Sequence, residues 1–265
     1  MAKLIGPFQF TGKLQDYSAY TRKDVEGIIL RKSGGADAQK IATDPAFART
    51  RENNHEFGGA STSAKLFRLA MSAVVPLADS SLTGRTTALC NSIIRLADTG
   101  TRGTRPLTFS AFRNLIESFN PNLKKPFTAI VKQEVIGTIV REHLTGTVIL
   151  PDLIPKVNFL PPASMPRFRF LITLGAITDM IHDHGVYSRV NSDIGLFEAA
   201  KVETPWFPTT KKFTGFSVDI VANNLNINET CTLMLSIGIQ FGKMGEDDTI
   251  TPVNTQGAVK ILRAV

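Results

Sequence analysis

The chain has 265 residues, of which 43% are hydrophobic and 20% are charged, and its net charge is +7. This composition excludes a wholly disordered chain and supplies enough apolar material for one large domain or two modest ones. No stretch of 18 uninterrupted apolar residues is present, and the first ten residues do not resemble a secretory signal peptide. We therefore expect a protein of the cytoplasm or of an assembled particle, with no membrane contact.

The charge is unevenly distributed along the chain. Residues 1–150 carry 20 Lys and Arg against 12 Asp and Glu, whereas residues 151–265 carry 10 against 11. The whole basic excess therefore lies in the first half. This asymmetry is typical of a protein whose first half faces a polyanion, although a scattered, solvated surface explains it as well.

The first 35 residues predict short strands separated by glycine turns. Apolar side chains alternate around Gly6 and Gly12, and Gly34-Gly35 closes the segment. So short an arm cannot bury a core of its own, and we expect it to pack on the rest of the chain or on a neighbouring subunit. The aromatic residues predicted to dock the arm are Phe8, Phe10, Tyr17 and Tyr20.

Helical signals follow the arm. Asp44 is a good N-cap and Pro45 suits a first helical position, so a helix is predicted over 46–57, ended by Gly58-Gly59. Apolar residues at helical spacing predict further helices over 63–75, over 83–97 with Thr83 as a candidate N-cap, and over 110–119.

From about residue 126, apolar residues begin to recur at every second position, which is the spacing typical of strands. Strands are predicted over 127–131, 146–150, 168–177, 213–221, 231–241 and 258–265. The alternation in 231–241 is typical of a half-buried strand. We expect an α+β protein with an N-terminal strand arm, a helical middle and a C-terminal antiparallel β-sandwich, Ig-like or jelly-roll-like. The expected division is 1–125 for the arm and helices and 126–265 for the sandwich.

The densest polar cluster lies within 47–59. Arg49, Arg51, Asn53 and Asn54 can donate to phosphates, to carboxylates or to backbone carbonyls. The favoured interpretation is that these four residues anchor an interface by tying the arm to the helices, in the same chain or in a neighbour. Contact with nucleic acid is the alternative.

Chemistry-bearing motifs are few. His182 and His184 form a His-x-His pair, and Asp179 could add a carboxylate, which makes the three residues weak metal candidates. A polar loop after a strand explains them better. Cys90 and Cys231 lie far apart in the sequence and are expected to be reduced core residues. We expect no cofactor.

Three segments carry a family resemblance: Phe10-Thr-Gly-Lys13, Arg31-Lys-Ser-Gly-Gly35 and the block Phe47 through Gly58. The block has the form Phe-x-Arg-Thr-Arg-x-Asn-x-x-Glu-Phe-Gly. With these motifs the chain resembles a family of Bacteroidota-type bacterial and mobile-element proteins that has no assigned activity. The resemblance implies a strand-rich C-terminal half and no catalytic activity.

The leading functional hypothesis is a non-enzymatic, self-assembling structural protein, coat-like or filament-like, whose partner is a second copy of itself. The alternative is a nucleic-acid-binding protein that uses the basic first half through Arg49, Arg51, Lys65 and Arg68. A second alternative is a metal-dependent enzyme built on His182 and His184.

Overall fold

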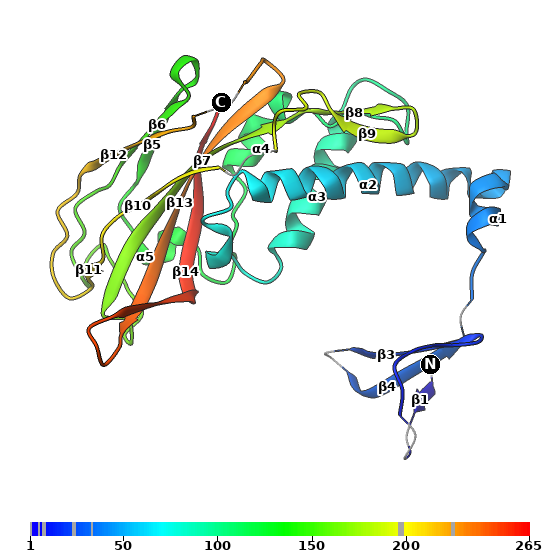
Figure 1. Ribbon diagram of the computed structural model, residues 1–265, viewed down its shortest axis with the longest axis horizontal. Coiled ribbons are helices and arrows are strands. Elements are labelled where there is room, and N and C mark those ends of the chain that lie inside the picture. Colours follow the sequence, from blue (N-terminus) through cyan, green and yellow to red (C-terminus); the bar gives the residue numbers. More distant parts are fainter. Residues whose placement is uncertain are drawn as a thin grey trace. The chain divides into compact units, whose positions relative to one another are not determined.

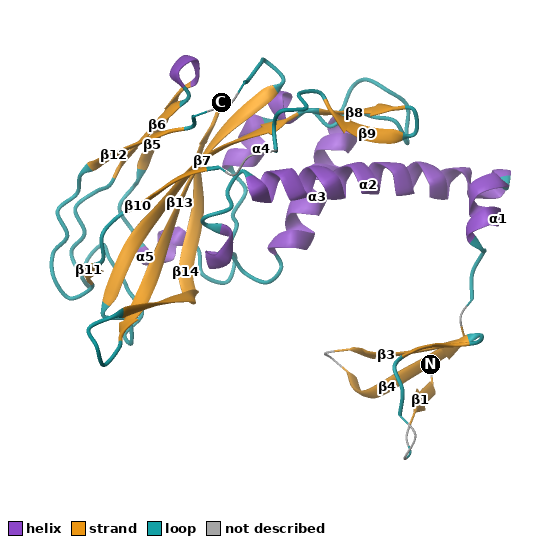
Figure 2. Ribbon diagram, in the orientation of Figure 1, coloured by secondary structure: helices purple, strands orange, loops and turns teal. Residues whose placement is uncertain are grey.

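The computed structural model describes residues 2–4, 6, 9–22, 25–32, 34–195, 199–223 and 226–265 (Figure 1). It has two compact units, Met1–Arg51 and Glu52–Val265. Unit 1 combines strands with short helical turns, and unit 2 combines helices with antiparallel sheets (Figure 2). The α+β class is confirmed. The predicted division at residue 125 is not the one seen, because residues 52–125 form one unit with the sheets.

Unit 1 contains an antiparallel sheet of its own. Its strand order is β1-β4-β3-β2, so β1 and β2 are the edge strands. The strands are β1 (Ala2–Leu4), β2 (Gly12–Leu14), β3 (Tyr17–Arg22) and β4 (Val25–Lys32). The predicted strand arm is therefore confirmed. Among its described residues, the buried hydrophobic side chains are those of Ala19, Ile28 and Ile29.

Two short helical segments follow the arm, α1 (Ala38–Thr43) and the 3-10 helix η1 (Pro45–Phe47). The Asp44 carboxylate accepts a hydrogen bond from the Ala46 amide at 2.9 Å, and Pro45 occupies the first turn. The helix start predicted at these two residues is confirmed, with a 3-10 turn leading into the following helix.

The longest helix, α2, runs over Ala48–Leu69 without a break. The predicted helix end at Gly58 and Gly59 is wrong. Most of the two helices predicted over 46–57 and 63–75 belongs to one continuous helix. The cause is packing, because Gly59 lies against the ring of Tyr187: a Cβ there would be 2.5 Å from the Tyr187 Cγ. Burial of the following turns outweighs the low helix propensity of glycine.

The two glycines of α2 should respond oppositely to alanine. Gly59→Ala is expected to lower the free energy of unfolding by about 1–3 kcal/mol, because Tyr187 must move. Gly58 has open space around its Cα. Gly58→Ala should raise stability by about 0.5–1 kcal/mol, because alanine restricts the unfolded chain and favours the helix. Urea denaturation of both variants checks this, and equal effects would contradict it.

The remaining helical elements of unit 2 are short, apart from α3. They are η2 (Val75–Leu77), α3 (Leu82–Leu96), η3 (Phe109–Ala111), α4 (Arg113–Glu117), α5 (Phe127–Ile130) and η4 (Arg141–His143). The helix predicted over 83–97 is confirmed as α3, although its N-cap is Ser81 and not Thr83. The strand predicted over 127–131 is wrong, because α5 occupies most of it.

Unit 2 has two main antiparallel sheets and a separate hairpin. The smaller sheet has the order β12-β6-β5, and the larger has the order β10-β7-β13-β14, with β11 also paired to β7. The strands are β5 (Ile136–Val140), β6 (Thr145–Ile149), β7 (Arg167–Thr178), β10 (Ala200–Glu203), β11 (Phe207–Pro208), β12 (Ser217–Val221), β13 (Cys231–Met244) and β14 (Ile250–Ala264). The hairpin pairs β8 (Met180–Asp183) with β9 (Val186–Arg189).

The larger sheet is covered on both faces. One face packs with the smaller sheet around a first core that includes Leu235 and Ile237 of β13, and the other packs with the helices around a second core that includes Met234 (Figure 1). The sandwich is therefore one part of a three-layer arrangement within unit 2. The prediction that 231–241 is half-buried is wrong, because helices cover the face that the alternation assigned to solvent.

The two cysteines are buried thiols in the chain's interior and form no disulfide. Burial raises the pKa of Cys90 to about 12. A thiol with so high a pKa is protonated at neutral pH and unreactive, which agrees with the predicted core role.

Candidate functional site

The candidate site is a polar cleft of about 770 Å³ between α2, α3 and the loop that follows α3. We call it the polar cleft. Its lining is rich in arginine and asparagine. The lining residues are Asn53, Asn54, Glu56, Phe57, Asn91, Arg95, Arg102 and Arg105.

An ion pair between the buried Glu56 and the half-buried Arg105 lines the polar cleft. The Glu56 carboxylate accepts two hydrogen bonds from Arg105, from Nε and from Nη2, both at 2.8 Å, and a third from the Gly103 amide at 2.8 Å. Such a bidentate pair fixes the guanidinium plane as well as neutralising the buried charge. The pair therefore joins the loop to α2.

The pKa shifts of Glu56 and Arg105 agree with a charged ion pair. Burial alone would raise the pKa of Glu56, but the hydrogen bonds from Arg105 and Gly103 bring that pKa below its ordinary value. The hydrogen bonds to Glu56 raise the pKa of Arg105. Tyr187 donates its hydroxyl to the Arg105 carbonyl at 2.7 Å, and burial together with the Glu56 charge raises its pKa to about 12. All three groups keep their usual charge at neutral pH.

The loop after α3 is held at a second point. Arg102 Nη2 donates to Asn53 Oδ1 at 2.8 Å, and its Nε lies 3.7 Å from Glu52 Oε2. Gly103 has a φ of +96°, and a Cβ there would lie 3.0 Å from the Cα of Glu52. Glycine is therefore required for the loop to approach α2 this closely.

Three further side chains of the polar cleft can donate hydrogen bonds to a ligand. The side chains of Asn54, Asn91 and Arg95 make no hydrogen bond or ion pair with any residue that the structure describes. Phe57 is 60% exposed at the same cleft. The polar cleft can therefore offer a guanidinium, two amides and an aromatic face to a ligand.

The predicted interface anchors have three different surroundings. Asn53 and Asn54 line the polar cleft. Arg51 instead donates from Nη1 to the carbonyls of Ile41 and Asp44, at 2.7 and 2.9 Å, and so ties α1 and η1 to the start of α2. Arg49 is exposed on α2.

Sequence reasoning missed the three arginines of the polar cleft, Arg95, Arg102 and Arg105. The signal available was the segment Thr101-Arg102-Gly103-Thr104-Arg105, in which two arginines flank a glycine. Nothing local shows that this segment folds back on α2, roughly fifty residues earlier in the chain.

The predicted arm residues differ in exposure. Tyr17 is 48% exposed, whereas Phe10 and Tyr20 are half-buried, and the Arg31 guanidinium carbon lies 5.7 Å from the Tyr20 ring centroid. Phe8 lies outside the described residues.

The two unit 2 residues predicted to contact nucleic acid, Lys65 and Arg68, have different surroundings. Arg68 Nη1 donates to Thr86 Oγ1 at 2.8 Å, which joins α2 to α3. Lys65 is exposed and lines a different cleft together with Tyr187 and Arg189. A phosphate chain would therefore meet Lys65 and the polar cleft as separate sites.

The metal candidates also lie apart. His182 lies in β8, and its ring centroid is 5.6 Å from that of His55 and 5.2 Å from that of Tyr187. His184 lies in the turn after β8 with a φ of +44°, so the two histidines do not share a strand. Asp179 accepts hydrogen bonds from the Ser110 amide and hydroxyl. Within the described part of the chain, no group of three or more His, Cys, Asp or Glu could hold a metal ion.

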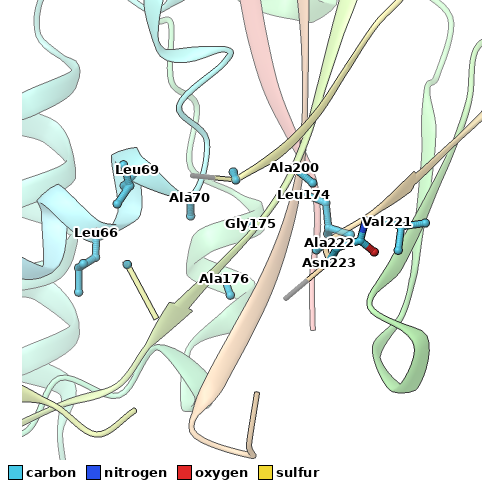
Figure 3. Close-up of a pocket in the computed structure, with 12 residues that line it drawn as sticks. Leu66, Leu69, Ala70, Leu174, Gly175, Ala176, Ala200, Val221, Ala222 and Asn223 are labelled. Carbon is cyan, nitrogen blue, oxygen red and sulfur yellow. The ribbon is translucent and has the colours of Figure 1, made fainter. Parts of the chain in front are cut away.

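A second cavity, of about 230 Å³, lies between the end of α2, β7 and the segment after β12. Figure 3 shows Leu66 and Leu69 on one side of it and Leu174, Ala200 and Val221 on the other. Its described lining is aliphatic apart from Asn223 and the backbone. The described lining therefore offers no group for acid–base or ionic chemistry.

The remaining observations concern membranes and known proteins. No helix in the described part of the chain has both the length and the apolar character needed to span a membrane. The chain matches no protein-family model, no curated protein and no solved structure in the comparisons made. The resemblance of Phe47 through Gly58 to a Bacteroidota-type family stays a prediction from the motif.

Proposed function

We propose that the protein is a non-enzymatic, self-assembling structural protein whose subunit contacts are made by its N-terminal arm. The supporting observation is the sheet of unit 1. Leu14 in edge strand β2 and Tyr17 in β3 are directly paired across the two strands, and they are 59% and 48% exposed. The unpaired backbone edge of β2, next to this exposed apolar pair, can contact a second copy of the chain.

The polar cleft supports the non-enzymatic part of the proposal. Glu56 is the one carboxylate among its described lining residues, and Arg105 and Gly103 occupy both of its oxygens. A general base works best when its pKa lies near the operating pH, whereas these hydrogen bonds hold the pKa of Glu56 below its ordinary value. The cleft is therefore better suited to binding than to proton transfer.

The assembly proposal predicts the behaviour of an arm variant. The double substitution Leu14→Ser, Tyr17→Ser in the full chain should weaken self-association by about tenfold or more, because both apolar side chains leave the contact. Size-exclusion chromatography with light scattering over a range of protein concentrations measures it.

Val157→Ser in unit 2 is the matched control. Val157 is 70% exposed, so its substitution removes an exposed apolar side chain outside the arm and should leave self-association unchanged. A wild-type chain that stays monomeric at high concentration, or a control that dissociates as readily as the arm variant, would refute the assembly proposal.

A further inference from the structure

The polar cleft has an uncompensated positive charge. Three arginines face one glutamate in its lining, and Arg105 is fully engaged with Glu56. Arg102 donates a hydrogen bond to Asn53 and forms an ion pair with Glu52, which offsets part of the arginine charge. Arg95, exposed on α3, is left without a carboxylate among the described residues. The cleft therefore favours an anion at Arg95.

The other donors of the cleft come from both helices. Asn91 and Arg95 are four residues apart on α3 and lie on one face of that helix. Asn54 and Phe57 are three residues apart on α2 and line the same cleft. An anion at Arg95 would thus have amide donors from both helices and an exposed aromatic ring beside it.

We propose that the polar cleft binds a nucleotide unit, with its phosphate at Arg95 and its base against Phe57. A guanidinium fork matches phosphate oxygens, and amides add neutral donors. An exposed phenylalanine provides a face on which a base stacks whatever its sequence. The cleft volume of about 770 Å³ is within the size range of small-molecule sites.

A free nucleotide and a single-stranded nucleic acid offer the same phosphate and base. The experiment therefore has two arms that use the full-length protein: calorimetric titration with AMP, and fluorescence anisotropy with a labelled twelve-residue oligothymidylate at low salt. Inorganic phosphate serves as a probe that has the phosphate group but no base. Binding in either arm supports the proposal and identifies the source.

Arg95→Gln should lower the affinity for each bound probe by about tenfold, because a charge-assisted contact is lost. For the oligonucleotide it should also reduce the slope of log affinity against log salt by about 0.7. Lys243→Gln is the control: this exposed lysine at the end of β13 lies outside the cleft, and its loss removes one charge from the same chain. The control should change affinity less than about twofold.

Phe57→Ser separates stacking from simple anion binding. It should weaken AMP or oligonucleotide binding by about fivefold or more and leave phosphate binding unchanged. The proposal is overturned if the wild-type protein binds neither AMP nor the oligonucleotide, if Arg95→Gln and Lys243→Gln behave alike, or if Phe57→Ser has no effect. None of these outcomes depends on the assembly proposal, which concerns the arm.

Discussion

Asp79→Ala is expected to lower the free energy of unfolding by about 3–5 kcal/mol, because it leaves a partly buried arginine without its partner. The Asp79 side chain is 3% exposed and accepts hydrogen bonds from Arg85, from the Ser81 amide and hydroxyl, and from the Leu123 amide. Arg85 in turn donates to the carbonyls of Asn120 and Pro121. This network joins the start of α3 to the segment after α4.

The same network makes stability depend on pH. Burial alone would raise the pKa of Asp79, but the hydrogen bonds from Ser81 and Leu123 and the charge of Arg85 hold it far below its ordinary value. Because the folded-state pKa is depressed, this contribution is fully present above the unfolded pKa of about 4 and is lost as pH falls below it. Acidification should therefore destabilise the wild-type chain more than Asp79→Asn.

Urea denaturation at pH 7 and at pH 3 measures both effects. Asp98→Ala is the control, because Asp98 is exposed and its substitution should change stability by less than about 0.5 kcal/mol. Equal losses for Asp79→Ala and Asp98→Ala would show that the network does not stabilise the fold.

The elements that sequence reasoning located well are those whose apolar period is long and clear. The α3 helix lies where helical spacing predicts it, and strands β7 and β13 lie where alternation predicts them. The short apolar run 127–131 is ambiguous, because periodicity over five residues does not separate a helix from a strand. The strand predicted over 258–265 begins eight residues earlier, at Ile250. The first part of β14 is polar and largely exposed, so it shows no apolar alternation from which a strand could be predicted.

The candidate site was predictable only in part, for a different reason. The density of polar residues indicated Asn53 and Asn54, which do line the polar cleft. The contacts of Arg102 and Arg105 with α2 bridge about fifty residues of sequence. Such long-range contacts depend on tertiary packing, which local composition and spacing do not predict.

Two phenylalanines of α2 differ sharply in burial. Phe67 is fully buried in the core between the helices and the larger sheet, with its ring centroid 5.6 Å from that of Phe119 and 6.4 Å from that of Phe109. Phe67→Ala should lower the free energy of unfolding by about 3–5 kcal/mol, because it removes apolar burial and leaves a cavity. Thermal and urea denaturation measure the loss.

Phe57→Ala is the matched control, with the same substitution ten residues earlier on the same helix. Phe57 is exposed at the polar cleft and belongs to neither core, so its loss should cost less than about 0.5 kcal/mol. A ring that contributes little to folding is free to contact a ligand, and this is the condition that base stacking requires. A loss for Phe57→Ala as large as that for Phe67→Ala would mean that Phe57 is a packing residue, and the proposed stacking face would have to be abandoned.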